Sequence, residues 1–293
     1  MNLKITTLIE NMPDAEEQLI YEHGFSVFVE VDGLRLLFDT GQSGRFVENA
    51  KALGVDLSET DLVILSHGHY DHTGGVPALL DKLEKKTPFY VGKEFFLPKY
   101  KLLEDGSWKY NGNPFENALI CGENSPVELN FVDNNATWLT NRLVLLKNFS
   151  RVTAYEEVNP KFFIKTETGY EPDLFMDEIS LGICTEEGLV LVVGCSHAGI
   201  INIVEHVKRE LGLPVTAVIG GTHLVEAGEQ RLIQTVQAIK RHGIQTIAVS
   251  HCTGEAGMSL LKEEFGENFI LNHTGKVLNV GKNICLKTTY KLL

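Results

Sequence analysis

The sequence predicts an α/β protein in which strands alternate with helices in a layered core. Two observations support this fold class. Short apolar runs that are typical of buried strands occur at 62–65, 189–193, 215–219 and 246–249. Stretches with helical periodicity lie between them, at 43–54, 200–211 and 229–241. Such alternation is typical of layered α/β folds.

The N-terminal part contains a predicted β-hairpin. Residues 25–31 and 34–38 are apolar runs separated by Asp32 and Gly33, and Asp-Gly between two such runs favours a hairpin turn. The helix that follows is expected to end near Gly54, because glycine commonly follows a helix C-terminus. The next elements are expected at 62–65 (strand), 76–85 (helix) and 89–91 (strand).

Residues 93–176 differ in character from the rest of the chain. They contain no histidine, few periodic runs, and scattered aromatic residues and turns. We interpret this segment as an insertion or flap within a single domain that spans residues 1–293. Its aromatic side chains, such as Trp108 and Tyr110, would either stack on a flat substrate ring or form a small satellite core.

The composition excludes several classes of protein. The chain has 39 acidic and 26 basic residues, and the resulting net charge of −13 would repel a phosphate backbone, so we expect no nucleic-acid partner. No segment resembles a signal peptide or has the ~18 apolar residues of a membrane-spanning helix. The five cysteines are odd in number and form no CxxC pair, which favours a cytoplasmic protein. The sequence leaves the oligomeric state open.

Three of the ten histidines lie within six residues of one another. His67, His69 and His72 follow the strand at 62–65 and are interleaved with Asp71. Alternate residues of an extended loop point the same way, so His67 and His69 suit one metal ion while Asp71 and His72 turn toward a second. Such ligands suit zinc, iron or manganese, and two ions roughly 3.5–4 Å apart can share a hydroxide. The alternative is a solvent-exposed loop that binds nothing.

Further histidines follow later strands at their carboxyl ends. His197, His223 and His251 each come one to four residues after an apolar run. Ligands of α/β folds gather at the carboxyl ends of strands, so we expect these side chains to approach the same rim as the first histidine cluster. His206 and His242 lie within a helix or at its end and are expected to bind no metal.

This pattern resembles the metallo-β-lactamase superfamily. The resemblance is carried by the His-x-His-x-Asp-His loop at 67–72, the Gly-Gly that follows it, the upstream Asp39-Thr40-Gly41 and the later histidines. It covers about residues 20–92 and 177–280. It implies an αβ/βα sandwich with a dinuclear metal site at one edge of two packed sheets.

The resemblance also implies roles for individual residues. His67 and His69 match ligands of the first metal ion, and Asp39 matches an aspartate that braces the metal loop. Asp71 and His72 match ligands of the second ion, and His251 matches the last metal-binding histidine.

Two positions depart from the superfamily pattern. The usual third histidine before the strand at 189–193 has no counterpart, so we take His197 as the candidate third ligand of the first ion. Cys195 stands where a bridging aspartate is usual, and it would either touch the second ion as a thiolate or pack as a small apolar residue. Glu178, just before a strand expected at 179–183, is another possible source of a carboxylate.

Four motifs together resemble the branch known as dihydropterin ribofuranosyl-aminobenzene phosphate synthases. They are Glu-His-Gly at 22–24, the metal loop itself, Gly-Cys-Ser-His at 194–197 and Gly-Gly-Thr-His at 220–223. The branch implies a pterin diphosphate substrate and a magnesium-aided displacement of diphosphate. Members of one branch can nevertheless differ in substrate.

The leading hypothesis is a hydrolase or transferase with two divalent metal ions, zinc in the first place and iron, manganese or magnesium as alternatives. Metal-bound water, its pKa lowered to ~7, would attack a phosphoryl or acyl centre of a small anionic substrate. Asp71 and His223 are the expected catalytic residues, with His223 as proton donor or substrate anchor. The alternatives are a lactone or thioester hydrolase, an oxygen-handling di-iron protein of the same fold, and a non-catalytic metal sensor. The di-iron class tends to place a carboxylate where this chain has His69.

The turn at 196–199 is expected to act as an anion site. It precedes the helix predicted at 200–211, so free backbone N–H groups and the positive helix end would attract a phosphate-bearing substrate. The alternative is that Ser196 merely caps the helix.

Overall fold

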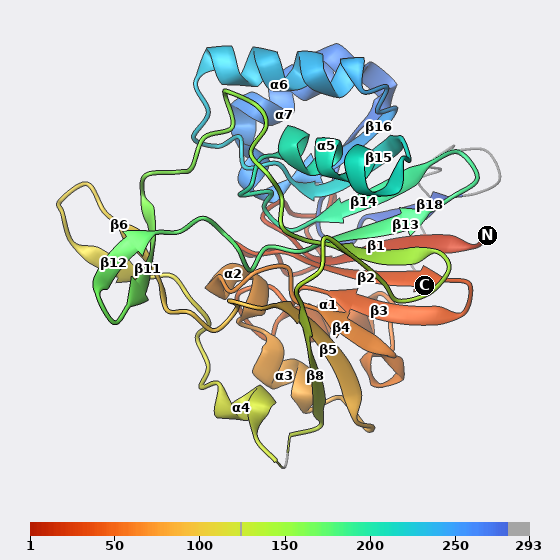
Figure 1. Ribbon diagram of the computed structural model, residues 1–293. Helices are drawn as coiled ribbons and strands as arrows, with labels where there is room; N and C mark the ends of the chain where they lie inside the picture. The colour runs from red at the N-terminus through yellow and green to blue at the C-terminus, as the bar shows by residue number, and fades with distance from the viewer. Residues whose placement is uncertain (124, 281–293) are drawn as a thin grey trace. The chain divides into compact units, whose positions relative to one another are not determined.

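The computed structural model describes residues 1–123 and 125–280, which form two compact units (Figure 1). Unit one comprises Met1–Val91, Asn111–Phe131 and the described residues from His273 onward, and unit two comprises Gly92–Tyr110 and Val132–Asn272. One of the five cysteines, Cys285, lies outside the described residues. The organisation of residues 1–293 as a single domain stays a prediction.

A mixed seven-stranded sheet forms the centre of unit one. Its strands, in spatial order, are β18 (Val277–Val280), β1 (Leu3–Ile9), β2 (Ser26–Val31), β3 (Leu34–Phe38), β4 (Leu62–Ile64), β5 (Thr87–Gly92) and β8 (Val127–Val132). The helical segments of this unit are α1 (Phe46–Ala52), η1 (Leu57–Glu59), α2 (Tyr70–Thr73), α3 (Val76–Leu80) and α4 (Ala118–Cys121). Strands β3, β4 and β5 pair in parallel, so their carboxyl ends lie along one edge of the sheet.

Strands β2 and β3 form the expected hairpin. They pair in antiparallel fashion up to Val31 and Leu34. Asp32 and Gly33, the two turn residues, have φ angles of 49° and 89°. A type I′ turn requires positive φ at both positions, which explains why Asp-Gly occupies this turn.

A second seven-stranded sheet forms the centre of unit two. Its strands, in spatial order, are β17 (Phe269–Leu271), β16 (Thr246–Ser250), β15 (Val215–Gly221), β14 (Leu189–Val193), β13 (Ser180–Cys184), β10 (Leu143–Leu146) and β9 (Ala136–Trp138). The helical segments are α5 (Ile200–Leu211), α6 (Glu229–Arg241), η2 (His251–Thr253), α7 (Gly254–Phe265) and η3 (Gly266–Asn268). The strands β14, β15 and β16 pair in parallel, so the residues after them emerge at one edge.

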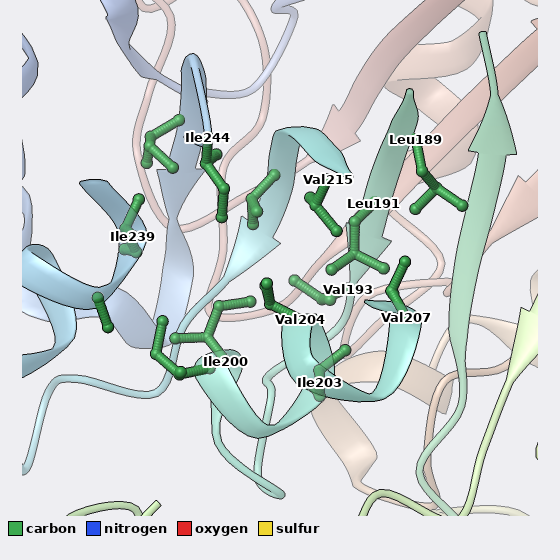
Figure 2. Packing of buried hydrophobic residues seen from close by; sticks show 14 of the residues in the cluster. Leu189, Leu191, Val193, Ile200, Ile203, Val204, Val207, Val215, Ile239 and Ile244 are labelled. Carbon is green, nitrogen blue, oxygen red and sulfur yellow. The ribbon is translucent and has the colours of Figure 1, made fainter. Parts of the chain in front are cut away.

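The core of unit two lies between this sheet and helix α5 (Figure 2). Ile200, Ile203, Val204 and Val207 recur on one face of α5 and pack with strand residues such as Leu191. Full burial of each side chain of this size contributes roughly 1.5–3 kcal/mol to folding. The helix therefore fixes the position of the turn that precedes it.

The segment 93–176 contributes to three sheets. Strand β8 belongs to the sheet of unit one, and β9 and β10 belong to the large sheet of unit two. The remaining strands form a separate four-stranded sheet in the order β12 (Gly169–Pro172), β11 (Phe162–Thr166), β6 (Lys99–Leu102) and β7 (Trp108–Tyr110). In this small sheet Trp108 stacks on Tyr170 with ring centroids 4.0 Å apart.

Several elements differ from the sequence prediction. Helix α3 ends at Leu80 rather than near residue 85, because a tight turn from Leu79 to Lys82 closes it. Strand β1 and helix α7 were not expected. The first turn of α7 contains Gly254 and Gly257, which lower helix propensity. A Cβ on Gly257 would lie only 3.1 Å from Cβ of Leu224, so close packing favours glycine there.

Within residues 1–123 and 125–280, no helix is long and apolar enough to cross a bilayer.

Removal of one core side chain tests the packing of α5. Ile203→Ala is expected to lower the free energy of unfolding by about 2–5 kcal/mol, because it leaves a cavity beneath the helix. Ile233→Ala on α6, where the side chain is 42% exposed, is the matched control and should change stability by about 0.5 kcal/mol or less. Equilibrium urea unfolding measures both, and equal effects would contradict this description of the core.

Candidate metal centre

The histidine loop of unit one is buried rather than exposed. His67, His69 and His72 are 0%, 3% and 0% exposed. The ring centroids of His67 and His69 lie 4.7 Å apart, and those of His67 and His72 lie 4.3 Å apart. Helix α2 begins directly after His69 and carries Asp71, 6% exposed, in its first turn. Three buried imidazoles beside a carboxylate form a donor set that suits a divalent cation.

Asp39 braces this loop from the end of β3. Its carboxylate accepts hydrogen bonds of 2.7 Å from both the backbone N–H and the hydroxyl of Ser66, and it lies 2.7 Å from Nδ1 of His72. The Nδ1 atom of His72 therefore donates to Asp39, which leaves Nε2 to act as a ligand atom. Burial raises the pKa of Asp39, and His72 and Ser66 oppose this rise.

His23 also reaches the loop. Its Nε2 atom lies 3.2 Å from a carboxylate oxygen of Asp71. The residue after it, Gly24, packs so tightly that a Cβ would lie 2.8 Å from the carbonyl oxygen of Asp71. The motif Glu-His-Gly at 22–24 therefore belongs to the surroundings of Asp71.

Unit two places its candidate residues after three parallel strands. Cys195 and His197 follow β14, His223 follows β15 and His251 follows β16, and all four are at least nine-tenths buried. Cys195 and His251 each present one ligand atom within 4.8 Å of the other. His223 and His251 have φ angles of 46° and 51°, and Ser196 has 60°. Left-handed backbone at non-glycine residues is costly and often occurs at functional sites.

His223 is held as a neutral side chain. Its ring centroid lies 4.4 Å from that of His197. Burial lowers the pKa of His223 to about 4. The positive charge of Arg231 also lowers this pKa, whereas the negative charge of Glu226 raises it. Near neutral pH its imidazole therefore has one N–H donor and one nitrogen acceptor.

Glu178 secures the turn that carries His197. Its two carboxylate oxygens accept hydrogen bonds from the backbone N–H groups of His197 and Ala198, at 2.7 and 2.8 Å. Burial raises the pKa of Glu178 to about 7, although these bonds oppose the rise. Arg151 donates to the carbonyl oxygens of the same two residues, at 3.1 Å each. Both oxygens of Glu178 are thus engaged in holding the turn.

The helix end expected to bind phosphate is already filled. The carboxylate of Glu156 accepts hydrogen bonds from the N–H groups of Ile201 and Asn202, at 2.9 and 2.8 Å. Glu178 accepts from the N–H groups of His197 and Ala198, in the turn that precedes the helix. The expectation of an anion site at 196–199 is therefore wrong, because two carboxylates of the chain itself occupy its donors.

Sequence reasoning missed the aromatic residues that pack on His197. Phe175 stacks on the imidazole with centroids 3.8 Å apart and planes at 6°, and Phe162 meets it edge-on at 5.4 Å. The ammonium groups of Lys99 and Lys101 lie 5.1 and 5.2 Å from the centroids of Phe175 and Phe162 respectively. Both lysines belong to β6, so the small sheet helps to orient His197.

Lys99 is fully buried between two aspartates. Its ammonium lies 2.7 Å from Asp173 and 2.9 Å from Asp177. Burial opposes the charge of Lys99, but the two carboxylates more than offset this effect and raise its pKa. The two aspartates flank Phe175, whose φ is 57°, so the ion pairs hold the turn that presents this ring.

Substitution of Lys99 tests whether these ion pairs support the unit. Lys99→Met is expected to lower the free energy of unfolding by about 3–5 kcal/mol, because it removes the ammonium that pairs with the buried carboxylates of Asp173 and Asp177. Lys93→Met removes an exposed pair with Asp133 and should cost less than about 1 kcal/mol. Urea unfolding measures both, and similar values for the two variants would contradict the assignment.

Substitution of Asp39 tests the brace in unit one. Asp39→Asn is expected to weaken metal binding about tenfold to a hundredfold, because an amide cannot orient His72 as a carboxylate does. The control is Asp32→Asn, the same chemical change in a hairpin turn that tolerates asparagine. Competition with a chelating dye measures the affinity, and unchanged binding in Asp39→Asn would rule out the bracing role.

Comparisons with known proteins place this geometry in a family. Residues 21–133 match the family model of the metallo-beta-lactamase superfamily. A curated relative from Methanocaldococcus jannaschii, named 7,8-dihydropterin-6-methyl-4-(beta-D-ribofuranosyl)-aminobenzene-5'-phosphate synthase, is 31% identical over 295 residues, which cover 94% of this chain and 96% of the relative. The uncharacterized protein MJ0448 of the same organism is 26% identical, over 94% of this chain and 100% of its own.

Solved structures agree with this assignment. Tm1679, described as a metal-dependent hydrolase of the beta-lactamase superfamily, superimposes with a TM-score of 0.81 and 31% identity, covering 96% of this chain and all of that one (100%). The metallo-beta-lactamase fold protein YhfI from Bacillus subtilis gives a TM-score of 0.58 at 12% identity, covering 95% of this chain and 100% of its own, which shows the shared fold. The expected fold class and superfamily are confirmed. The chain belongs to the metallo-β-lactamase superfamily and is an enzyme.

Proposed function

We propose that the chain is a metal-dependent hydrolase or transferase that acts on a small anionic substrate carrying a phosphate or diphosphate group. The observation that supports it most is the buried metal loop, in which His67, His69 and His72 pack together with Asp71 around a brace from Asp39. Such a loop would be costly to bury without a cation to bind, because three imidazoles and a carboxylate are desolvated together.

Two metal ions would be shared among six side chains. His67, His69 and His197 would hold the first ion, and the second would be held by Asp71, His72 and His251. Cys195 lies beside His251 in unit two and is a further candidate for the second ion. Imidazole nitrogen and thiolate sulfur favour zinc or iron over magnesium, which prefers oxygen ligands. When bound, ions of this kind polarise phosphoryl or acyl oxygens and supply a nucleophile near neutral pH.

The chain's own residues would orient the reacting groups. Asp71, next to His23, would hold a proton or a ligand position at the second ion. His223 would anchor the substrate, because its neutral imidazole can donate one hydrogen bond to a substrate oxygen. Glu178 and Arg151 would keep the turn of His197 in place.

A pterin-related phosphate compound is the substrate we favour. The M. jannaschii relative is named as the synthase of a dihydropterin product that carries a 5'-phosphate, and 31% identity over 96% of its length supports a related substrate class. We further propose a cytoplasmic location, from the widely spaced cysteines, and no nucleic-acid partner, from the net charge of −13.

Ligand substitutions test the metal assignment. His67→Ala, Asp71→Ala and His251→Ala are each expected to lower bound metal and activity at least tenfold, because each removes a coordinating atom. His242→Ala is the control, since this partly exposed histidine pairs with Glu205 on helix α5. His206 is a poorer control, because it is buried. Metal analysis of protein purified without chelator gives the stoichiometry, and an unchanged value in His251→Ala would sink the two-ion assignment.

A substrate screen tests the reaction class. Turnover of phosphomonoesters, phosphodiesters or pterin diphosphates by the metal-loaded enzyme would support the proposal. Hydrolysis of lactones or thioesters alone would favour the acyl-hydrolase alternative. Oxygen consumption by an iron-loaded form would favour the di-iron alternative.

A further inference from the structure

We propose that Arg231, Lys101 and Lys161 form a binding site for the anionic group of the substrate beside His223. This inference rests on the proposed function, because it states where the phosphate of such a substrate would be held. All four residues belong to unit two.

Arg231 is a half-buried cation that forms no ion pair with a carboxylate among residues 1–123 and 125–280, although its charge acts on the buried Glu156. It lies in the first turn of α6, and its Nη2 atom donates a 3.5 Å hydrogen bond to the carbonyl oxygen of His223. Its Nε atom is buried and has no acceptor within the described part of the chain. A desolvated guanidinium donor normally binds a carboxylate or a phosphate. In a chain with a net charge of −13, a guanidinium that forms no ion pair is suited to bind an anion from outside the chain.

Two lysines supply further positive charge near His223. The ammonium of Lys101 lies 5.2 Å from the ring centroid of Phe162, and this ring lies 6.0 Å from that of His223. Lys101 and Lys161 approach the same oxygen of Glu226, at 3.7 and 3.0 Å. One carboxylate therefore faces two ammonium groups, both of which remain partly exposed.

The charges of this cluster converge on His223. Arg231 and Lys101 both act on its imidazole, and Glu226 opposes them. The cluster thus carries three positive charges and one negative charge. The N–H groups of the α5 end are taken by Glu156 and Glu178, so these cations offer an alternative place for a phosphate in this unit.

Strand β6 supplies an internal comparison. Lys99 and Lys101 lie two residues apart, and each contacts an aromatic ring that packs on His197. Lys99 is enclosed by Asp173 and Asp177, which compensate its charge. The Lys101 side chain is 34% exposed and shares its carboxylate partner with Lys161. The position of Lys99 suits a structural role, whereas that of Lys101 suits ligand binding.

Titration calorimetry of the metal-loaded protein with inorganic diphosphate tests the site. Arg231→Gln and Lys101→Met are each expected to weaken binding about tenfold, because each removes a charge-assisted contact. Glu226→Gln is expected to tighten binding, since it removes the competing carboxylate. Lys165→Met is the control, because it makes the same charge change on β11, where the ammonium lies 5.9 Å from the ring of Tyr170. Metal content is measured in every variant.

The outcomes separate this inference from the proposed function. The inference is wrong if the wild type binds no diphosphate, if Lys101→Met and Arg231→Gln bind as Lys165→Met does, or if the loss of affinity follows a loss of metal. If the expected order of affinities holds but no phosphate-bearing substrate is turned over, the anion site stands and the proposed reaction fails. Lys101 is partly exposed, so Lys101→Met provides the answer even if Arg231→Gln unfolds.

Discussion

The carboxylate of Asp39 connects the end of β3 to the loop after β4, and the metal loop of unit one depends on it. It is fully buried and has three partners: two donors from Ser66 and Nδ1 of His72. A buried carboxylate is costly unless such bonds compensate it. Once compensated, it fixes both the path of the chain at Ser66 and the ring orientation of His72. A brace of this kind orients a candidate metal ligand, and such bracing favours tight metal binding.

Unit two uses carboxylates in a different way. Glu156 and Glu178 bind the backbone N–H groups at the start of α5, where a helix would otherwise attract an external anion. Their role is to fix the turn of His197, and Arg151 fixes the same turn through its carbonyl oxygens. Because these donors are already occupied, the start of α5 offers them to no external anion.

The sequence was most informative where structure is locally determined. The bounds of β3, β14, α5 and α6 could be predicted from the spacing of apolar residues and from turn residues within short stretches of sequence. The histidine motif likewise marks the loop after β4. The hydrogen bonds from α5 to Glu156 join residues that are 45 and 46 positions apart. The ion pairs of Lys99 span 74 and 78 positions. No local pattern encodes such long-range partners, so a free helix end was expected where an occupied one exists.

The small four-stranded sheet contributes two lysines, Lys99 and Lys101, whose surroundings suit different roles. Lys99 lies beside the ring of Phe175, which stacks on His197. The ammonium of Lys99 is buried, and Asp173 and Asp177 compensate its charge. Through Lys101 the sheet contributes a partly exposed cation two residues away on the same strand. Substitution at Lys99 is therefore expected to disturb both folding and the orientation of His197, whereas substitution at the partly exposed Lys101 is expected to cost less stability. Buried and exposed positions of one strand thus serve different purposes: the buried lysine stabilises the surroundings of His197, and the exposed one is free to face a ligand.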